Sequence, residues 1–153
     1  MVEYIGGPQF AHLLLGPLEN LAVVEETVVR EKACDSINQL AGIMSDQQIQ
    51  TFYLPLLHRL SSGEWFTSRT SAALLFASVY EKIPLSMRAD VHSMFVSLCT
   101  DETPMVRRAA ARDMSALVKR MSPEVIINEM LPLYRRLSAD DQDSVRLLTV
   151  QNL

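Results

Sequence analysis

The chain has 153 residues, 48% of them hydrophobic, which is enough apolar material for one domain with a buried core. The formal net charge is -4 and the pI is about 5.3, so the positive field that draws proteins to nucleic acid or anionic lipid is missing. No apolar run approaches the ~18 residues of a membrane span, and the start lacks the basic segment of a secretory signal. We expect a soluble intracellular protein of the cytoplasm, with the nucleus as a second candidate compartment, that binds neither nucleic acid nor membrane.

Apolar residues recur at helical spacing along the whole chain, and strand alternation is nowhere sustained. Residues 1–6 are expected to be the tail of a preceding helix, followed by a turn. The predicted helix pairs follow in chain order as 8–22 with 25–44, 46–61 with 65–82, 86–99 with 104–121, and 123–138 with 142–153. The predicted fold is all-α, an α-α superhelix or solenoid of about four stacked helical hairpins, in one array with units at about 8–44, 46–82, 86–121 and 123–153.

Two apolar stripes carry much of this prediction. The stripe of the second helix in the first unit, at steps of three and four residues, is formed by Val29, Ala33, Ile37, Leu40 and Met44. The stripe of the first helix in the second unit is formed by Tyr53, Leu56, Leu57 and Leu60. Each helix therefore has one face that must be buried against another helix.

Helix starts are also marked in the sequence. Ser45 and Gln48 have the spacing of a capping box, in which each side chain bonds the backbone of the other. A cap followed by a first-turn proline occurs twice, at Thr103-Pro104 and at Ser122-Pro123.

Three prolines occupy nearly the same position inside the first helix of their units, at Pro17, Pro55 and Pro132. A proline inside a helix has no amide to donate, so each is predicted to kink its helix. A kink that recurs with the repeat belongs to the architecture.

A frame of four residues recurs four times along the chain. Each copy has a leucine, an acidic residue four places later, an arginine five further on and a small residue three beyond. The arginines, at spacings of 39, 38 and 39, are Arg30, Arg69, Arg107 and Arg146. A period in this range is typical of stacked helical repeats, because a repeat cannot bury its apolar face without its neighbours.

We predict that these arginines are structural. Equivalent arginines in a stack lie one repeat apart and can bridge to acidic turn residues of a neighbouring unit. Asp101 and Asp140, six residues before the arginine of their own unit, are suitable partners, whereas Val24 and Gly63 fill that position in the first two units. The predicted arginine–aspartate ladder is therefore incomplete.

The sequence offers no catalytic or metal-binding constellation. The three histidines, His12, His58 and His92, occupy different positions within their repeats, so no shared site follows. None of the motifs HExxH, GxxxxGK[ST] or GxSxG is present. Cys34 and Cys99 lack CxxC spacing, and we interpret both as reduced core thiols. We expect a protein that is not an enzyme and that binds no metal or cofactor.

The turn of the second unit departs from the repeat. It carries Trp65 and Phe66 where the other units have mainly polar residues. One interpretation is that either ring lies under the neighbouring turn. The functional interpretation is that Trp65 anchors another protein, because tryptophan and arginine are enriched in interface hot spots. With Met105 and the additional cation Arg108 on the next turn, the predicted surface is a mixed apolar and charged ridge.

Several unbroken segments at these turns closely resemble successive HEAT repeats of the scaffold (A, regulatory 65 kDa-type) subunit family of protein phosphatase 2A. The segments are EWFTSRTSA at 64–72, DETPMVRRAAA at 101–111 and DQDSVRLL at 141–148, with GGP at 6–8 and VEETVVR at 24–30 similar to the preceding repeat. The resemblance spans essentially the whole chain. It places the chain in the N-terminal half of such a scaffold.

The resemblance implies a horseshoe of HEAT repeats whose turns bind other subunits. Regulatory (B-type) subunits would bind the N-terminal half, and the catalytic subunit would bind only C-terminal repeats that are missing here. Carried over to this chain, the regulatory-subunit ridge would comprise Glu25, Glu26, Trp65, Phe66, Pro104, Met105, Arg108 and Asp143. The resemblance thus implies a non-catalytic scaffold segment.

Two alternatives remain open at this stage. An importin-type transport adaptor would also be a helical solenoid, but it would need acidic and aromatic residues on inward-facing second helices. A helical-repeat enzyme would need a metal or cofactor. The last predicted helix stops at Leu153, while its equivalents run a turn or two further, so we also expect the chain to be a fragment without the polar end caps of a repeat array.

Overall fold

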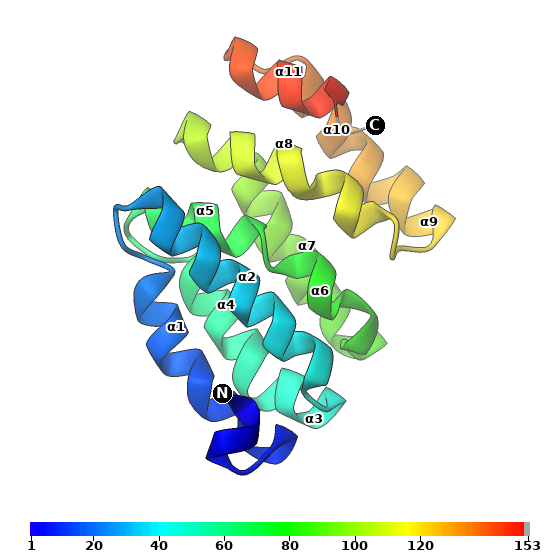
Figure 1. Ribbon diagram of the computed structural model, residues 1–153. Helices are drawn as coiled ribbons and strands as arrows, with labels where there is room; N and C mark the ends of the chain where they lie inside the picture. Colours follow the sequence, from blue (N-terminus) through cyan, green and yellow to red (C-terminus); the bar gives the residue numbers. More distant parts are fainter. Residues whose placement is uncertain (152–153) are drawn as a thin grey trace.

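The computed structural model describes residues 1–151, and over this range it contains helices and turns but no strand (Figure 1). The predicted all-α class is confirmed. The predicted end of the last helix at Leu153 lies outside the described residues. Within residues 1–151, no helix is both long enough and apolar enough to cross a bilayer.

The helices lie close to their predicted positions. In chain order the elements, with η for a 3₁₀- or π-helical segment, are η1 (Val2–Ile5), η2 (Pro8–Leu14), α1 (Leu15–Leu21), α2 (Thr27–Ile43), α3 (Asp46–Gln48), η3 (Ile49–Tyr53), α4 (Leu54–Ser61), α5 (Phe66–Ala73), α6 (Phe76–Val79), η4 (Tyr80–Lys82), α7 (Leu85–Cys99), α8 (Pro104–Val118), α9 (Pro123–Val125), η5 (Ile126–Met130), α10 (Leu131–Ser138) and α11 (Asp143–Gln151). Most of the predicted boundaries agree within three residues.

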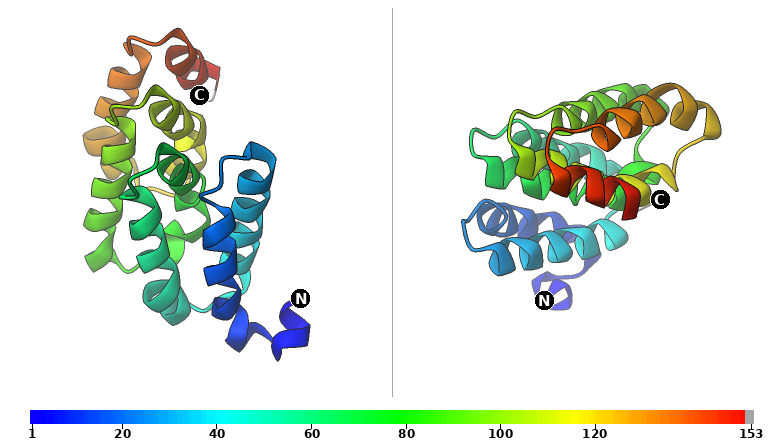
Figure 2. Two further views of the ribbon diagram at one scale, coloured as in Figure 1. Left: turned by 90° about the vertical axis from the view of Figure 1, so that its left-hand side faces the viewer. Right: turned by 90° about the horizontal axis from the view of Figure 1, so that it is seen from above.

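Antiparallel hairpins make up the array. Within the hairpins α1 contacts α2, α4 contacts α5, α7 contacts α8 and α10 contacts α11, while α8 packs against both α5 and α11. Figure 2 shows the hairpins following one another from the N-terminal end to the C-terminal end. The fold is a HEAT-like solenoid, as predicted.

The two predicted apolar stripes form part of a continuous core. Leu56, Leu57 and Leu60 are at most 1% exposed, and Ile37 is fully buried. Val29 is the exception, because it is 40% exposed near the start of α2. Cys34 and Cys99 are buried and unpaired, and burial raises the pKa of the Cys99 thiol to about 12. Both thiols therefore behave as small core residues.

The predicted capping box is present at the start of α3. The Gln48 amide donates to Ser45 Oγ at 3.2 Å, and the Ser45 amide donates to Gln48 Oε1 at 3.0 Å. Ser122 likewise accepts from the Val125 amide. Thr103 is the residue before α8, but its side chain makes no capping bond. The Thr103 amide instead donates to Asp101 Oδ1 at 2.8 Å.

The recurring prolines coincide with changes of helix type. Pro55 and Pro132 each follow a five-residue π-helical segment, η3 and η5 respectively. Pro17 follows the 3₁₀ segment η2. The third unit has no equivalent proline, and its first helix α7 is continuous over fifteen residues. The missing proline amide explains the difference, because it leaves a carbonyl one turn earlier without its usual donor.

One predicted helix, 65–82, is broken in the structure. Helix α5 ends at Ala73, and the Leu74 and Leu75 amides donate to carbonyls only three residues back. The carbonyls released by the break have partners from other elements. Asn38 Nδ2 donates to the Leu74 oxygen at 3.1 Å, and the Tyr53 hydroxyl donates to the Leu75 oxygen at 3.1 Å. Contacts from the first unit and from η3 therefore stabilise a break that periodicity alone could not indicate.

Candidate partner-binding ridge

The four turns that join the helices of each hairpin lie along one edge of the molecule (Figure 1). We name them turn 1 (22–26), turn 2 (62–65), turn 3 (100–103) and turn 4 (139–142). Together with the first residues of the helices that follow them, they form the ridge.

A repeated arginine holds each turn from within. Its Nη1 donates to the carbonyl six residues earlier in the same turn, and in the first three units also to the carbonyl five residues earlier. For Arg69 the acceptors are Gly63 and Glu64, both at 2.9 Å. Arg30, Arg107 and Arg146 make the corresponding bond six residues back, at 2.8, 2.9 and 2.5 Å. The arginine recurs because it supplies donors to turn carbonyls that no helix satisfies.

Two of these arginines also join neighbouring turns. Arg69 pairs with Asp101 through Nε–Oδ2 and Nη2–Oδ1 distances of 2.7 and 3.2 Å. Arg107 pairs with Asp140 in the same way, at 2.7 and 2.9 Å. These two-bond contacts fix both distance and orientation between turns.

The aspartates of these pairs have a second role in their own turns. Oδ1 of Asp140 accepts the Gln142 amide at 3.0 Å, as Asp101 does for Thr103. The hydrogen bond from Arg107 lowers the pKa of the Asp140 carboxyl from its ordinary value to about 2. Asp140 therefore stays ionised at any physiological pH.

The first turn has no such pair with the second. Gly63 stands where Asp101 and Asp140 stand in later units, and a Cβ added there would overlap Ser68 Oγ. Ser68 Oγ in turn donates to the Leu60 carbonyl at 2.9 Å. An aspartate at position 63 would displace this bond. The ladder is incomplete here for a local steric reason.

The first two hairpins are joined by other contacts. The Ser71 and Thr67 hydroxyls donate to the carbonyls of Ala22 and Val23 at 2.6 and 2.9 Å. On the outer side, Arg59 forms two bonds of 2.7 Å with Glu19. Neutral hydroxyl donors thus occupy the role that charged pairs have further along the array.

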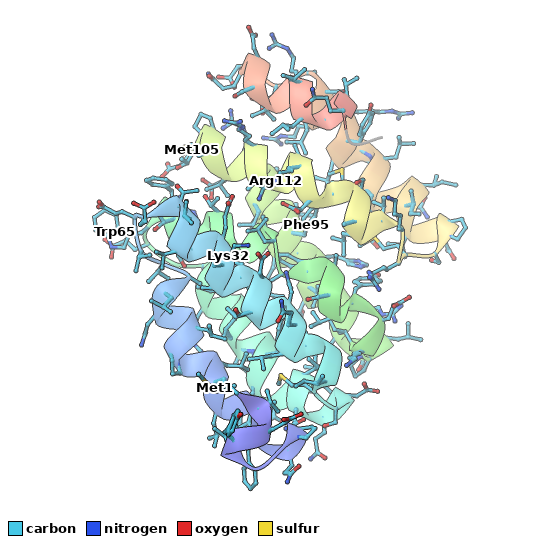
Figure 3. All side chains as sticks on the ribbon, in the orientation of Figure 1. Met1, Lys32, Trp65, Phe95, Met105 and Arg112 are labelled. Carbon is cyan, nitrogen blue, oxygen red and sulfur yellow. The ribbon has the colours of Figure 1, made fainter. Side chains whose placement is uncertain are left out.

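All eight residues implied by the resemblance lie on the ridge. Trp65 is 72% exposed and Met105 is 54% exposed, and Figure 3 shows both at the same edge of the molecule. Phe66 and Pro104 are half-buried. The remaining four are exposed charged residues, namely Glu25, Glu26, Arg108 and Asp143.

A cleft of about 590 Å³ lies between turns 1 and 2, and we call it the turn cleft. Its lining residues come from turns 1 and 2 and from the starts of α2, α5 and α8: Val23, Val24, Glu25, Thr27, Arg30, Trp65, Phe66, Thr67 and Met105. The structure thus brings Glu25, Trp65, Phe66 and Met105 into one site. Arg108 and Asp143 lie elsewhere on the ridge and do not line it.

Sequence reasoning missed a buried contact among three units. His92 is buried, its Nε2 lies 2.8 Å from the Tyr80 hydroxyl, and its Nδ1 lies 2.6 Å from Glu129 Oε2. These residues come from η4, α7 and η5 and have no shared position in the repeat, so spacing gave no signal. Among residues 1–151, no group of three His, Cys, Asp or Glu side chains is arranged to hold a metal ion.

The fold and the repeated turns define the chain as a helical-repeat solenoid, and a comparison with solved structures agrees. A crystal structure of Cex1p matches 95% of this chain and 31% of its own, with a TM-score of 0.64 at 13% identity. That likeness concerns the fold alone. No protein-family model matches the chain.

Sequence relatives identify the family. The chain is 48% identical over 149 residues to the regulatory A subunit of protein phosphatase PP2A in Schizosaccharomyces pombe. It is 38% identical over 159 residues to the protein of the same name in Saccharomyces cerevisiae. It is 50% identical over 115 residues to the beta isoform of the human 65 kDa regulatory A subunit of serine/threonine-protein phosphatase 2A.

These alignments cover 97, 99 and 75% of this chain, but only 25, 25 and 19% of the relatives. The chain is homologous to one segment of the regulatory A subunits of protein phosphatase 2A. The resemblance seen in its turns is confirmed. The chain spans about a quarter of the length of the two yeast relatives.

Proposed function

We propose that this chain is a non-catalytic scaffold segment that presents its ridge to a regulatory (B-type) subunit of protein phosphatase 2A. The observation that carries the proposal is the pair of exposed apolar side chains, Trp65 and Met105, beside the turn cleft. Single exposed apolar side chains are common on protein surfaces, but apolar side chains gathered beside a cleft mark an interaction site, and tryptophan is among the residue types most enriched in interface hot spots.

The fixed spacing of the turns supports this role. The Arg69–Asp101 and Arg107–Asp140 pairs hold turns 2, 3 and 4 in relation to one another before any partner arrives. A partner that contacts several turns then spends little free energy on ordering them. The names of the relatives, which are regulatory or scaffold subunits, agree with a non-catalytic part.

We also propose that the chain alone does not retain the phosphatase catalytic subunit. The resemblance assigns that contact to C-terminal repeats, whereas this chain corresponds to one segment of the relatives. A pull-down with purified catalytic subunit tests this point. Retention of the catalytic subunit on the isolated chain would contradict it.

The importin-type alternative is not favoured. It would need acidic and aromatic side chains facing inward from the second helices. Helices α5 and α8, which pack against each other, instead bury several alanines: Ala72, Ala73, Ala109, Ala110 and Ala111. Small buried residues allow close helix packing and leave little of this face for cargo.

Replacement of the exposed tryptophan tests the proposal directly. Trp65→Ala is expected to weaken binding of a purified B-type subunit by about 2 kcal/mol or more, because the indole is the largest exposed apolar group on the ridge. Titration calorimetry gives the affinity. The indole is mostly exposed, so the helical spectrum and the urea midpoint should change little.

A matched control is available away from the proposed contact residues. Leu147→Ala removes an exposed apolar side chain, 57% exposed, from α11, far from the turn cleft. It is expected to leave the affinity within about 0.5 kcal/mol. Unchanged affinity in Trp65→Ala, with intact helical structure, would rule out the anchoring role.

A further inference from the structure

Arg30 lies in the turn cleft and is 6% exposed. Val24, Phe66 and Met105 supply apolar walls around it. A guanidinium cannot lose its charge in a protein, so in this setting it must have hydrogen-bond and charge partners.

Arg30 has the hydrogen bonds but lacks the opposite charge. Its Nη1 donates to the Val24 and Glu25 carbonyls at 2.8 and 3.1 Å, and its Nη2 reaches Thr27 Oγ1 at 3.4 Å. No carboxylate of residues 1–151 forms an ion pair with it.

The other three repeated arginines each have an acid. Arg69 pairs with Asp101, Arg107 with Asp140, and Arg146 with Asp143. Arg30 is thus the member of the set whose charge is uncompensated, and it also lines the turn cleft. Gly63 explains the missing acid, because Ser68 leaves no room for a side chain at that position.

We propose that an aspartate or glutamate of the regulatory subunit enters the turn cleft and pairs with Arg30, and that an apolar side chain beside it packs against Trp65 and Met105. This inference rests on the function proposed above. The entering carboxylate would supply the charge that Asp101 supplies to Arg69. A charge pair formed away from water, with an arginine already held in place, is both strong and directional.

The charges at the rim decide which kind of acid can enter. Glu25 lines the cleft, and Glu26 is exposed beside it; neither forms an ion pair among the described residues. They would repel a free anion. An acidic side chain carried on a protein segment gains the apolar contacts as well, which offset this repulsion.

The fourth unit shows how Arg30 could be given a carboxylate from its own helix, which would take the place of one from a partner. Asp143 stands three residues before Arg146 and pairs with it, and Thr27 stands three residues before Arg30. Thr27→Asp therefore copies an arrangement that the chain already uses, at the first position of α2, where a negative charge suits the helix dipole. Thr27→Asn has the same size without the charge.

A second control separates the cleft from general charge effects. Val28→Asp adds the same charge one residue further along α2, at a side chain that is 64% exposed and outside the cleft. All three variants change exposed residues, and equal urea midpoints would show that the fold is retained.

Binding of a purified B-type subunit is measured for each variant by titration calorimetry. Thr27→Asp is expected to bind at least about tenfold more weakly than Thr27→Asn, whereas Val28→Asp stays within about threefold of the unmodified chain. Each surface Asp and Glu of the regulatory subunit is then changed to Asn or Gln. One such change should lower the affinity for the unmodified chain by about tenfold. The same change should lower the affinity for the Thr27→Asp chain by less than about twofold.

The remaining outcomes overturn the inference in distinguishable ways. Equal affinities for Thr27→Asp and Thr27→Asn would show that no acid enters the cleft, while the proposed function would stand. Tighter binding by Thr27→Asp would show that the cleft accepts a basic segment through Glu25 and Glu26. Failure of the unmodified chain to bind any regulatory subunit would remove the proposed function and this inference together.

Discussion

Apart from the exposed Arg59–Glu19 pair, the first and second hairpins are joined by hydroxyl, amide and ammonium groups that donate to backbone carbonyls, whereas the later hairpins are joined by arginine–aspartate pairs. Ser71 and Thr67 bond the end of α1, Asn38 bonds the break after α5, and Lys82 Nζ bonds the Ala41 and Met44 carbonyls at 2.7 and 2.8 Å. The contacts between the first two hairpins thus use carbonyls that have no donor within their own helix, at helix ends and at the break after α5.

The comparison shows that a repeat sequence does not imply repeated contacts. We call the contact region between two neighbouring hairpins a junction. In the later junctions Asp101 and Asp140 form ion pairs with the arginines of the preceding units. The first junction has Gly63 in that place and leaves an open cleft beside Arg30. The same departure therefore interrupts the charge ladder and leaves Arg30, which lines the turn cleft, without an acid.

The largest expected effect comes from removing a charged pair. Arg107→Met leaves Asp140 without its cation and releases the Asp101 and Glu102 carbonyls, so it should destabilise the chain by about 3–5 kcal/mol. Arg30→Met leaves no unpaired carboxylate and should cost about 1–3 kcal/mol. Urea unfolding followed by circular dichroism measures both. Equal losses would mean that the aspartate contributes nothing to the later junction.

Acid should affect the two kinds of junction differently. The folded-state pKa of Asp140 is about 2, below its unfolded value of roughly 3.9, so its stabilisation is fully present above about pH 4 and is lost as the pH falls to 2. The loss should be on the order of 2 kcal/mol. Urea unfolding between pH 5 and 2 measures it.

Asp140→Asn is the control for this pH dependence. The variant should be less stable near neutral pH but should lose less stability between pH 4 and 2, since the asparagine does not titrate. The hydroxyl bonds of Ser71 and Thr67 have no titrating group. An unchanged acid dependence in Asp140→Asn would assign the effect to other carboxylates.

The first junction can be weakened without changing any charge. Ser71→Ala removes the buried hydroxyl that reaches the Ala22 carbonyl and should destabilise the chain by about 1–2 kcal/mol, with no dependence on salt. Thr70→Ala at the preceding residue removes a bond within the same helix, to the Phe66 carbonyl, and should destabilise the chain less than Ser71→Ala does. A larger loss in Thr70→Ala would contradict the assigned role of Ser71.

The smallest effect is expected at the outer ion pair. Arg59 and Glu19 are joined by two short bonds, but the arginine side chain is 57% exposed. Glu19→Gln should therefore cost less than about 1 kcal/mol, and the difference should shrink as salt increases. Urea midpoints at low and high sodium chloride concentration test this. A loss as large as that of Arg107→Met would place this pair among the main contacts between hairpins.

Helices and turns were predictable because their signals are local. The apolar steps around Ile37 and Leu57, the Ser45–Gln48 capping box and the recurring prolines depend on neighbours within a few residues. The exposed position of Trp65 also followed from a local departure from the repeat. The break after Ala73 was missed, because the partners that stabilise it, Asn38 and Tyr53, come from other elements.

The sequence by itself determined the helical class, the repeat, the turns and the residue types along the ridge, since each depends on spacing along the chain. Only the tertiary structure decided that each aspartate pairs with the arginine of the preceding unit, and where a cleft remains. Asp101 and Asp140 reach arginines of the preceding units, whereas Ser68 fills the space beside Gly63 within the second unit. Spacing sets which side chains share an edge, but steric fit between neighbouring units sets which of them meet.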